Sequence, residues 1–202
     1  MLLSSSDIEQ FETLKKVQLI TSLPGAKPMC LVGSQSPAGG TNLAPFSSIT
    51  HLGSSPALIG MVTRPDTVER HSLNNILAME SWTLNHVDSQ ILEQAHQCAA
   101  KYPQETSEFK ATGLTEQYYP SFKAPAVKES HIKYGLKLEE IITIQSNGTK
   151  LIVGSVEFID IDERFLLDSG GIDLCAAGSV ASTALDTYFT LAEPRSLAYA
   201  RP

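Results

Sequence analysis

Positive charge is scarce in this sequence, and so is cysteine. The 202 residues include 15 lysines and arginines against 22 aspartates and glutamates, which gives a formal net charge of -7. A protein that binds nucleic acid needs a basic face to neutralise phosphates, so this composition argues against a nucleic-acid partner. The three cysteines, Cys30, Cys98 and Cys175, lie far apart. Their odd number and wide spacing predict reduced core thiols rather than a disulfide framework or a zinc site.

Long apolar runs are missing as well. No uncharged apolar stretch approaches the length of a membrane span, and the first residues, MLLSSSDIEQF, lack the basic start and long apolar segment of a signal peptide. We therefore expect a cytosolic protein with no membrane contact. The length suits one domain over residues 1–202, and no repeat, linker or domain boundary is visible.

The familiar catalytic motifs are absent too. The sequence has no G-x-G-x-x-G after a strand, no P-loop, no H-E-x-x-H and no G-x-S-x-G elbow. The five histidines do not pair at metal-ligand spacing, and acidic pairs such as Glu139–Glu140 are typical of solvated strand rims. We therefore predict neither a metal site nor a catalytic side chain.

Short apolar runs between turn residues dominate what is present, and they predict strands over 29–34, 42–50, 57–63, 81–87, 136–144 and 150–161. Asn147–Gly148 predicts a tight hairpin turn between the last two. Helices are expected over 6–17, with a Ser6–Glu9 capping box, over 72–79 and over 90–102, with one more in the tail. The expected fold is mainly β with peripheral helices, in a barrel.

One uncharged stretch, TNLAPFSS at 41–48, lies between the predicted strands and is rich in hydroxyl groups. Pro45 cannot donate to a sheet ladder, so it marks an edge, a bulge or a bend. Downstream, Arg64 follows an apolar strand and could hold a phosphate through bidentate bonds. The patterning by itself favours a bent edge strand and a surface arginine over a phosphate site, because Thr-Arg-Pro is not a specific signal.

Taken whole, the sequence resembles the flavin reductase-like, FMN-binding split barrel family. The resemblance is closest from about Val17 to Val87, where LVGSQSPAGGTNLAPFSSIT is similar to the family's strand, turn and N-L-A-P-F-S segment. PALIGMVTRPDTVERHSLNNILAMESWTLNHV is similar to its second strand, Asp-Thr loop, Asn-containing helix and following strand. SEFKATGLT, APAVKESHIKYGLKLEE and GTKLIVGSVEF resemble later parts of the family pattern.

The resemblance implies a split β-barrel homodimer with FMN near the subunit interface. It also implies hydride transfer from NADH or NADPH to flavin N5, with the reduced flavin serving an oxygenase or another electron acceptor. The cofactor supplies this chemistry, so no protein acid, base or nucleophile is required. By resemblance, the ring and ribityl chain would be lined by Thr41, Asn42, Leu43, Ala44, Pro45, Phe46, Ser47 and Ser48. The phosphate end would be surrounded by Thr63, Arg64, Pro65, Asp66, Thr67 and Asn75.

Two other function classes stay open at this point. One is a module that carries FMN without turnover, which single-turnover reduction by NADH or NADPH would separate from a reductase. The other is a hydrolase that uses one of the many serines, against which the missing nucleophile elbow counts.

Overall fold

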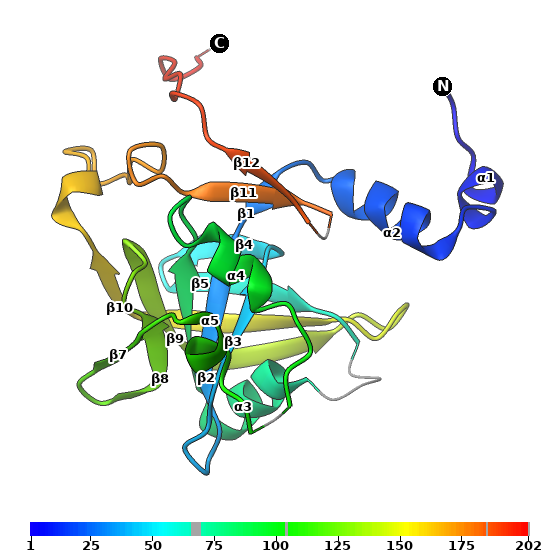
Figure 1. Ribbon diagram of the computed structural model, residues 1–202. Helices are drawn as coiled ribbons and strands as arrows, with labels where there is room; N and C mark the ends of the chain where they lie inside the picture. Colours follow the sequence, from blue (N-terminus) through cyan, green and yellow to red (C-terminus); the bar gives the residue numbers. More distant parts are fainter. Residues whose placement is uncertain (66–69, 104, 185, 202) are drawn as a thin grey trace.

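The structure is a computed structural model, and it describes residues 1–65, 70–103, 105–184 and 186–201 (Figure 1). The helices are α1 (Ser5–Glu9), α2 (Thr13–Ser22), α3 (His71–Met79), α4 (Leu92–Gln97), α5 (Glu108–Thr112) and the short 3-10 helix η1 (Glu163–Phe165). The strands are β1 (Lys27–Pro28), β2 (Cys30–Gln35), β3 (Thr41–Phe46), β4 (Ile49–Ser54), β5 (Ala57–Thr63), β6 (Ser81–His86), β7 (Glu116–Tyr119), β8 (Phe122–Val127), β9 (Ile132–Thr143), β10 (Lys150–Ile161), β11 (Val180–Thr183) and β12 (Thr187–Thr190).

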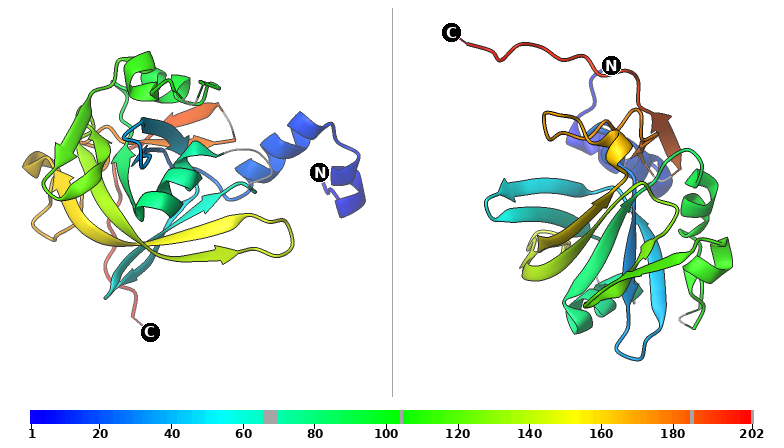
Figure 2. Two further views of the ribbon diagram at one scale, coloured as in Figure 1. Left: turned by 90° about the horizontal axis from the view of Figure 1, so that it is seen from below. Right: turned by 90° about the vertical axis from the view of Figure 1, so that its left-hand side faces the viewer.

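The body of the molecule is a seven-stranded antiparallel sheet in the order β3-β2-β6-β9-β10-β5-β4. The sheet coils without closing, so β3 and β4 remain as its two edges among the described strands (Figures 1 and 2). Two smaller sheets, β1-β11-β12 and β7-β8, lie beside it. The prediction of a mainly β split barrel with peripheral helices is confirmed.

The long β9–β10 hairpin confirms the clearest local prediction, although its turn is wider than expected. The connection runs over residues 144–149, and the Ile144 amide closes it on the Thr149 carbonyl at 2.8 Å. Gly148 has a φ of +74°, where a side chain would be strained. Asn147 Oδ1 accepts bonds from the backbone and hydroxyl of Thr149, which orders the six-residue loop.

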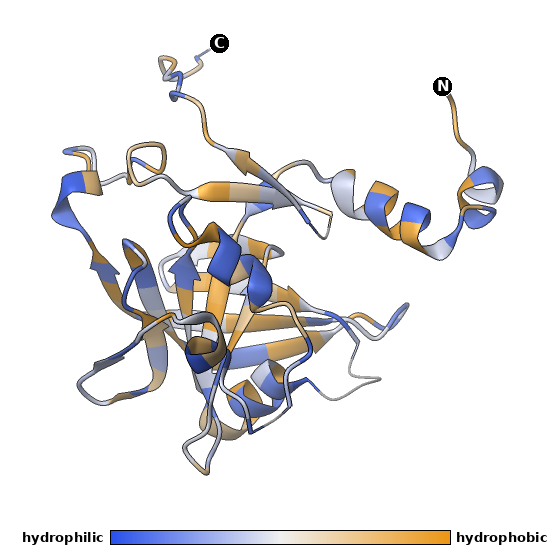
Figure 3. Cartoon of the chain, in the orientation of Figure 1, coloured by the Kyte–Doolittle hydropathy of each residue, from blue (hydrophilic) through white to orange (hydrophobic). Residues whose placement is uncertain are grey.

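Strand β2 lies at the centre of the core because both of its faces are buried. Leu31 packs into one apolar cluster with Leu43 and Phe109, while Val32 packs into another around Trp82. The hydrophobic colours of Figure 3 gather on these central strands. Trp82 is fully buried. Cys30 and Cys98 are buried free thiols, and Cys175 is partly exposed.

The N-terminal prediction is wrong in detail. Residues 6–17 do not form one helix; α1 and α2 are separate, and the capping box joins Ser4 to Asp7 instead of Ser6 to Glu9. Both serines precede an acid by three residues, so the sequence offered two alternative caps. The two helices, called the arm below, project from the body, and none of their residues is buried (Figure 1).

Two further helix predictions are corrected. The helix expected over 90–102 is only Leu92–Gln97, because Asp88 Oδ1 bonds the amides of Gln90 and Ile91 and holds that stretch in a turn. The helix expected in the tail is replaced by β11 and β12, which pair with each other and with β1. No helix in the described part of the chain is long and apolar enough to span a membrane.

Candidate functional site

The stretch singled out in the sequence, 41–48, forms edge strand β3 and the turn that follows it. Among the described strands, β3 pairs only with β2, and Pro45 lies opposite Leu31. Because Pro45 has no N–H, an edge position costs it no ladder bond. Of the three interpretations left open for Pro45, the structure selects the edge.

The first polar side chains of this strand are bonded inside the protein. Thr41 Oγ1 donates to Glu116 Oε1 at 2.7 Å and bonds the Ser107 hydroxyl, and Asn42 Nδ2 donates to Ser72 Oγ at 2.9 Å. Leu43 is fully buried in the core. These contacts fix β3 in place, so the role of Thr41, Asn42 and Leu43 in lining a ligand stays a prediction.

The turn after β3 brings two distant pieces of sequence together. Ser47 and Ser48 connect β3 to β4, and the Val62 amide donates to the Ser48 carbonyl at 2.8 Å. Strand β4 then pairs with β5, with Ile49 opposite Met61. The two serines therefore lie beside the end of β5, where Thr63 and Arg64 follow. The turn at Ser47 and Ser48 and the end of β5 are therefore neighbours, and together they are the candidate site.

Several polar groups at this site lack a protein partner within the described ranges. Thr63 is only 5% exposed, yet its hydroxyl has no hydrogen-bond partner among the residues that the structure describes. Buried hydroxyls are normally bonded, so an orphan here points to a ligand atom that completes it. Within the described residues, the hydroxyls of Ser47 and Ser48 form no hydrogen bond. Arg64 is exposed. Hydroxyl and guanidinium donors of this kind suit an oxyanion such as a phosphate.

Arg64 also borders a groove of about 530 Å³, whose size is ordinary for a small-molecule site. Helix α2 forms the other wall through Thr13, Leu14, Val17 and Thr21. The groove therefore combines one cationic end with a largely apolar wall.

The remaining predicted residues are placed as follows. Asn75 Nδ2 donates to Ser34 Oγ at 3.1 Å inside the fold, and it joins α3 to β2. The structure does not bring the Asn75 amide group to Arg64. Pro65 follows Arg64 and is partly buried, and Ala44 and Phe46 are partly buried on β3. Asp66 and Thr67 lie outside the described residues.

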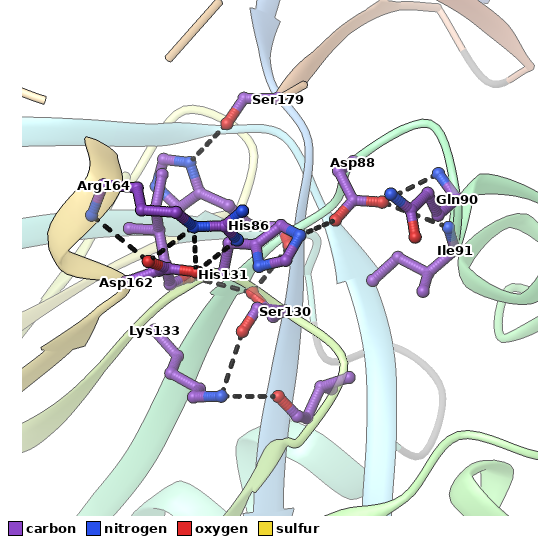
Figure 4. Close-up of polar contacts among 12 residues, drawn as sticks. His86, Asp88, Gln90, Ile91, Ser130, His131, Lys133, Asp162, Arg164 and Ser179 are labelled. Atoms are coloured by element: carbon purple, nitrogen blue, oxygen red, sulfur yellow. Dashed lines mark hydrogen bonds and ion pairs between the residues drawn. The ribbon is translucent and has the colours of Figure 1, made fainter. Parts of the chain in front are cut away.

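A separate polar cluster, which the sequence did not reveal, lies where β6, the start of β9 and the bridge at Ser179 meet (Figure 4). Ser179 Oγ lies 3.5 Å from His86 Nδ1, and Asp88 Oδ2 lies 3.7 Å from His131 Nε2. No sequence motif links these residues, since they come together only through strand pairing.

This cluster does not assemble a serine nucleophile. The carboxylate of Asp88 contacts His131 and not His86, the histidine that faces the serine. Burial lowers the pKa of His86 to about 4, which makes it a poor base near neutral pH. Ser179 is itself buried. The hydrolase alternative therefore gains no support from this cluster. Within the described residues, no group of three or more acidic, histidine or cysteine side chains could hold a metal ion.

A family model and a solved structure both point to a flavin reductase-like protein. Residues 25–171 match the model of the flavin reductase-like domain. A split-barrel protein from Shewanella frigidimarina, provisionally described as a flavin reductase, is 42% identical, with a TM-score of 0.95 over 99% of this chain and all of that one. Nitrilotriacetate monooxygenase component B from Bacillus cereus is 23% identical, with a TM-score of 0.86 over 98% of both chains. An uncharacterised protein of Halalkalibacterium halodurans is 30% identical over 85% of this chain and 84% of its own length.

Proposed function

Because this chain belongs to the flavin reductase-like family, as its match over residues 25–171 shows, we propose that it is an FMN-dependent reductase that takes hydride from NADH or NADPH. Family membership supports a flavin-related oxidoreductase. FMN as the particular flavin, and a pyridine nucleotide as donor, are the proposal. The observation that carries it is the group of unpartnered donors at the joined ends of β3 and β5, centred on the orphan hydroxyl of Thr63.

In this proposal, the residues of the chain bind the flavin and orient it. Arg64 and the Thr63 hydroxyl hold the phosphate, which distinguishes FMN from riboflavin. The turn at Ser47 and Ser48 offers hydroxyl groups next to them, and the edge strand β3 forms the wall beside the ring. FMN, when bound, supplies the hydride-accepting centre that the side chains lack. No residue of the chain needs to act as an acid or a base.

We also propose a homodimer in which a second copy covers the site. The arm supports this, because Leu14 and Leu23 on or next to α2 are 60% and 68% exposed in the single chain. Exposed leucines on a projecting helix are unfavourable in water and are typical of a protein-protein interface. The groove beside Arg64 is walled by that same arm, so a partner on the arm would shield the ligand from water.

The dimer is tested by light scattering on the flavin-loaded protein at micromolar concentration. A dimer mass for the full chain, and a monomer mass after Leu14→Glu and Leu23→Glu, are expected. A monomer that retains FMN would contradict a site that needs two copies. The cytosolic location and the identity of an oxygenase or other electron acceptor remain predictions.

The test of the reaction is anaerobic reduction. The FMN-loaded protein is mixed with NADH or with NADPH, and the visible flavin absorption is followed. We expect one of the two nucleotides to bleach the absorption and air to restore it. If neither nucleotide bleaches intact bound FMN over hours, the protein carries FMN without turnover and the reductase proposal is wrong.

A further inference from the structure

The edge strand β3 is fastened from outside the main sheet by a short segment much later in the chain. Glu108, the first residue of α5, is only 7% exposed, and its Oε2 accepts the Leu43 amide at 2.9 Å. One residue earlier, Ser107 bonds the Thr41 hydroxyl at 2.7 Å. Phe109, the next residue, packs beside Leu43 in the core. Three successive residues of this segment therefore contact β3.

The Glu108 bond occupies a particular position on the strand. In an antiparallel edge strand, alternate residues turn their N–H groups toward the partner strand and away from it. The Leu43 amide bonds Glu108 instead of β2, so Leu43 and Pro45 belong to the outward-facing set. Pro45 has no N–H, which leaves the Leu43 amide as the outward donor nearest to the turn at Ser47. Glu108 holds it.

A carboxylate is a costly choice for this purpose. Burial raises the pKa of Glu108, and its bonds from the amides of Leu43 and of Glu108 itself, with the charge of His71, offset only part of that rise. An apolar side chain in the same place would avoid that cost but would leave the Leu43 amide without this partner. What the carboxylate fixes is the Leu43 amide, and through it the backbone of β3 at that point.

We propose that Glu108 is a positioning residue for the cofactor, because its bond to the Leu43 amide holds the backbone of β3 in the conformation that receives the flavin ring. This inference rests on the function proposed above. Glu108 bonds the outer edge of β3 and, in this proposal, touches no ligand itself. Glu108 acts on the site through β3, which lies beside the flavin ring. Its loss should therefore weaken the binding of every flavin, whether or not the flavin carries a phosphate.

The experiment titrates apoprotein with FMN and with riboflavin and follows the quenching of flavin fluorescence. Glu108→Ala is expected to weaken both flavins equally, by about tenfold. Glu108→Gln keeps an oxygen at the same place and is expected to restore both affinities to within about twofold. Lys110→Ala, a change on the same short helix, is the matched control and is expected to leave both affinities at the wild-type value.

The outcomes separate the inference from the function. If Glu108→Ala lowers the urea midpoint but binds both flavins as tightly as wild type, the residue is structural only and the inference is wrong. A loss for FMN alone would contradict it too, because the strand would then serve the phosphate. If Glu108→Ala does not fold, Glu108→Asp, whose carboxylate is one methylene short, must show the equal loss. Wild-type protein that binds neither flavin refutes the proposed function itself.

Discussion

Replacing Thr63 by valine is expected to change stability and ligand binding in opposite directions. Thr63 is 5% exposed on β5, and its hydroxyl has no partner among the described residues. A buried polar group without a hydrogen bond costs about 1–3 kcal/mol, and valine keeps the branched shape without the hydroxyl. Thr63→Val should therefore stabilise the apoprotein by about 1 kcal/mol, measured by urea unfolding.

The same substitution removes a donor to the proposed phosphate. A hydrogen bond to a charged group contributes about 1.5–3 kcal/mol, so FMN affinity should fall roughly ten- to a hundredfold. Fluorescence titration of the apoprotein measures that loss directly. A gain in stability with a loss of binding is the usual sign of a side chain kept for function.

Thr83→Val is the matched control for Thr63→Val. Thr83 is buried as well, but its hydroxyl donates to the Pro125 carbonyl at 2.7 Å and accepts from Asn85 at 3.0 Å. Its removal should destabilise the apoprotein by about 1–3 kcal/mol and leave FMN affinity unchanged. If Thr63→Val destabilised the protein as Thr83→Val does, the Thr63 hydroxyl would have a protein partner. If it stabilised the protein but bound FMN normally, the site would lie elsewhere.

Three further predictions follow from single residues. Arg64→Ala should weaken FMN by about tenfold and barely change riboflavin, since only FMN carries a phosphate; equal losses in the same titrations would make Arg64 a fold or ring residue. Gly33→Ala should destabilise the protein by roughly 2–4 kcal/mol in urea, because a Cβ would lie 2.1 Å from the Pro125 carbonyl oxygen, whereas Gly171→Ala, with its nearest contact at 3.5 Å, should be near neutral. The buried His86 is neutral at pH 7 with a pKa of about 4 against the ordinary 6.5, so its stabilisation is present above pH 6.5 and lost on acidification toward pH 4. His86→Asn should flatten that part of the urea-midpoint profile, and an unchanged acid loss would assign it to other groups.

The strands were predictable because their signals are local. The runs that form β2, β5 and β6 are apolar and bounded by turn residues, and Asn147–Gly148 marks the one long hairpin. The helices of the N-terminal arm were harder. Two serines each precede an acid by three residues, and only the three-dimensional structure shows that Ser4 forms the cap.

The candidate site was only half predictable, for a physical reason. Pro45 and Arg64 could be singled out by residue type, since one cannot donate to a sheet and the other suits a phosphate. That the Ser48 carbonyl accepts the Val62 amide depends on how β4 folds back on β5. The orphan state of the Thr63 hydroxyl depends on what surrounds it, and so does the bond from the Leu43 amide to Glu108 across 65 positions. No sequence pattern predicts the unpaired Thr63 hydroxyl or the Leu43–Glu108 bond.

The central claim is that the chain binds FMN, and the cofactor of the purified protein tests it most directly. The visible spectrum of the protein is recorded, the protein is denatured, and the released compound is identified by mass. The account predicts a flavin spectrum and FMN close to one per chain, or saturable FMN binding to the same ratio when the isolated protein is colourless. A colourless protein that gains no flavin signal from added FMN would contradict it.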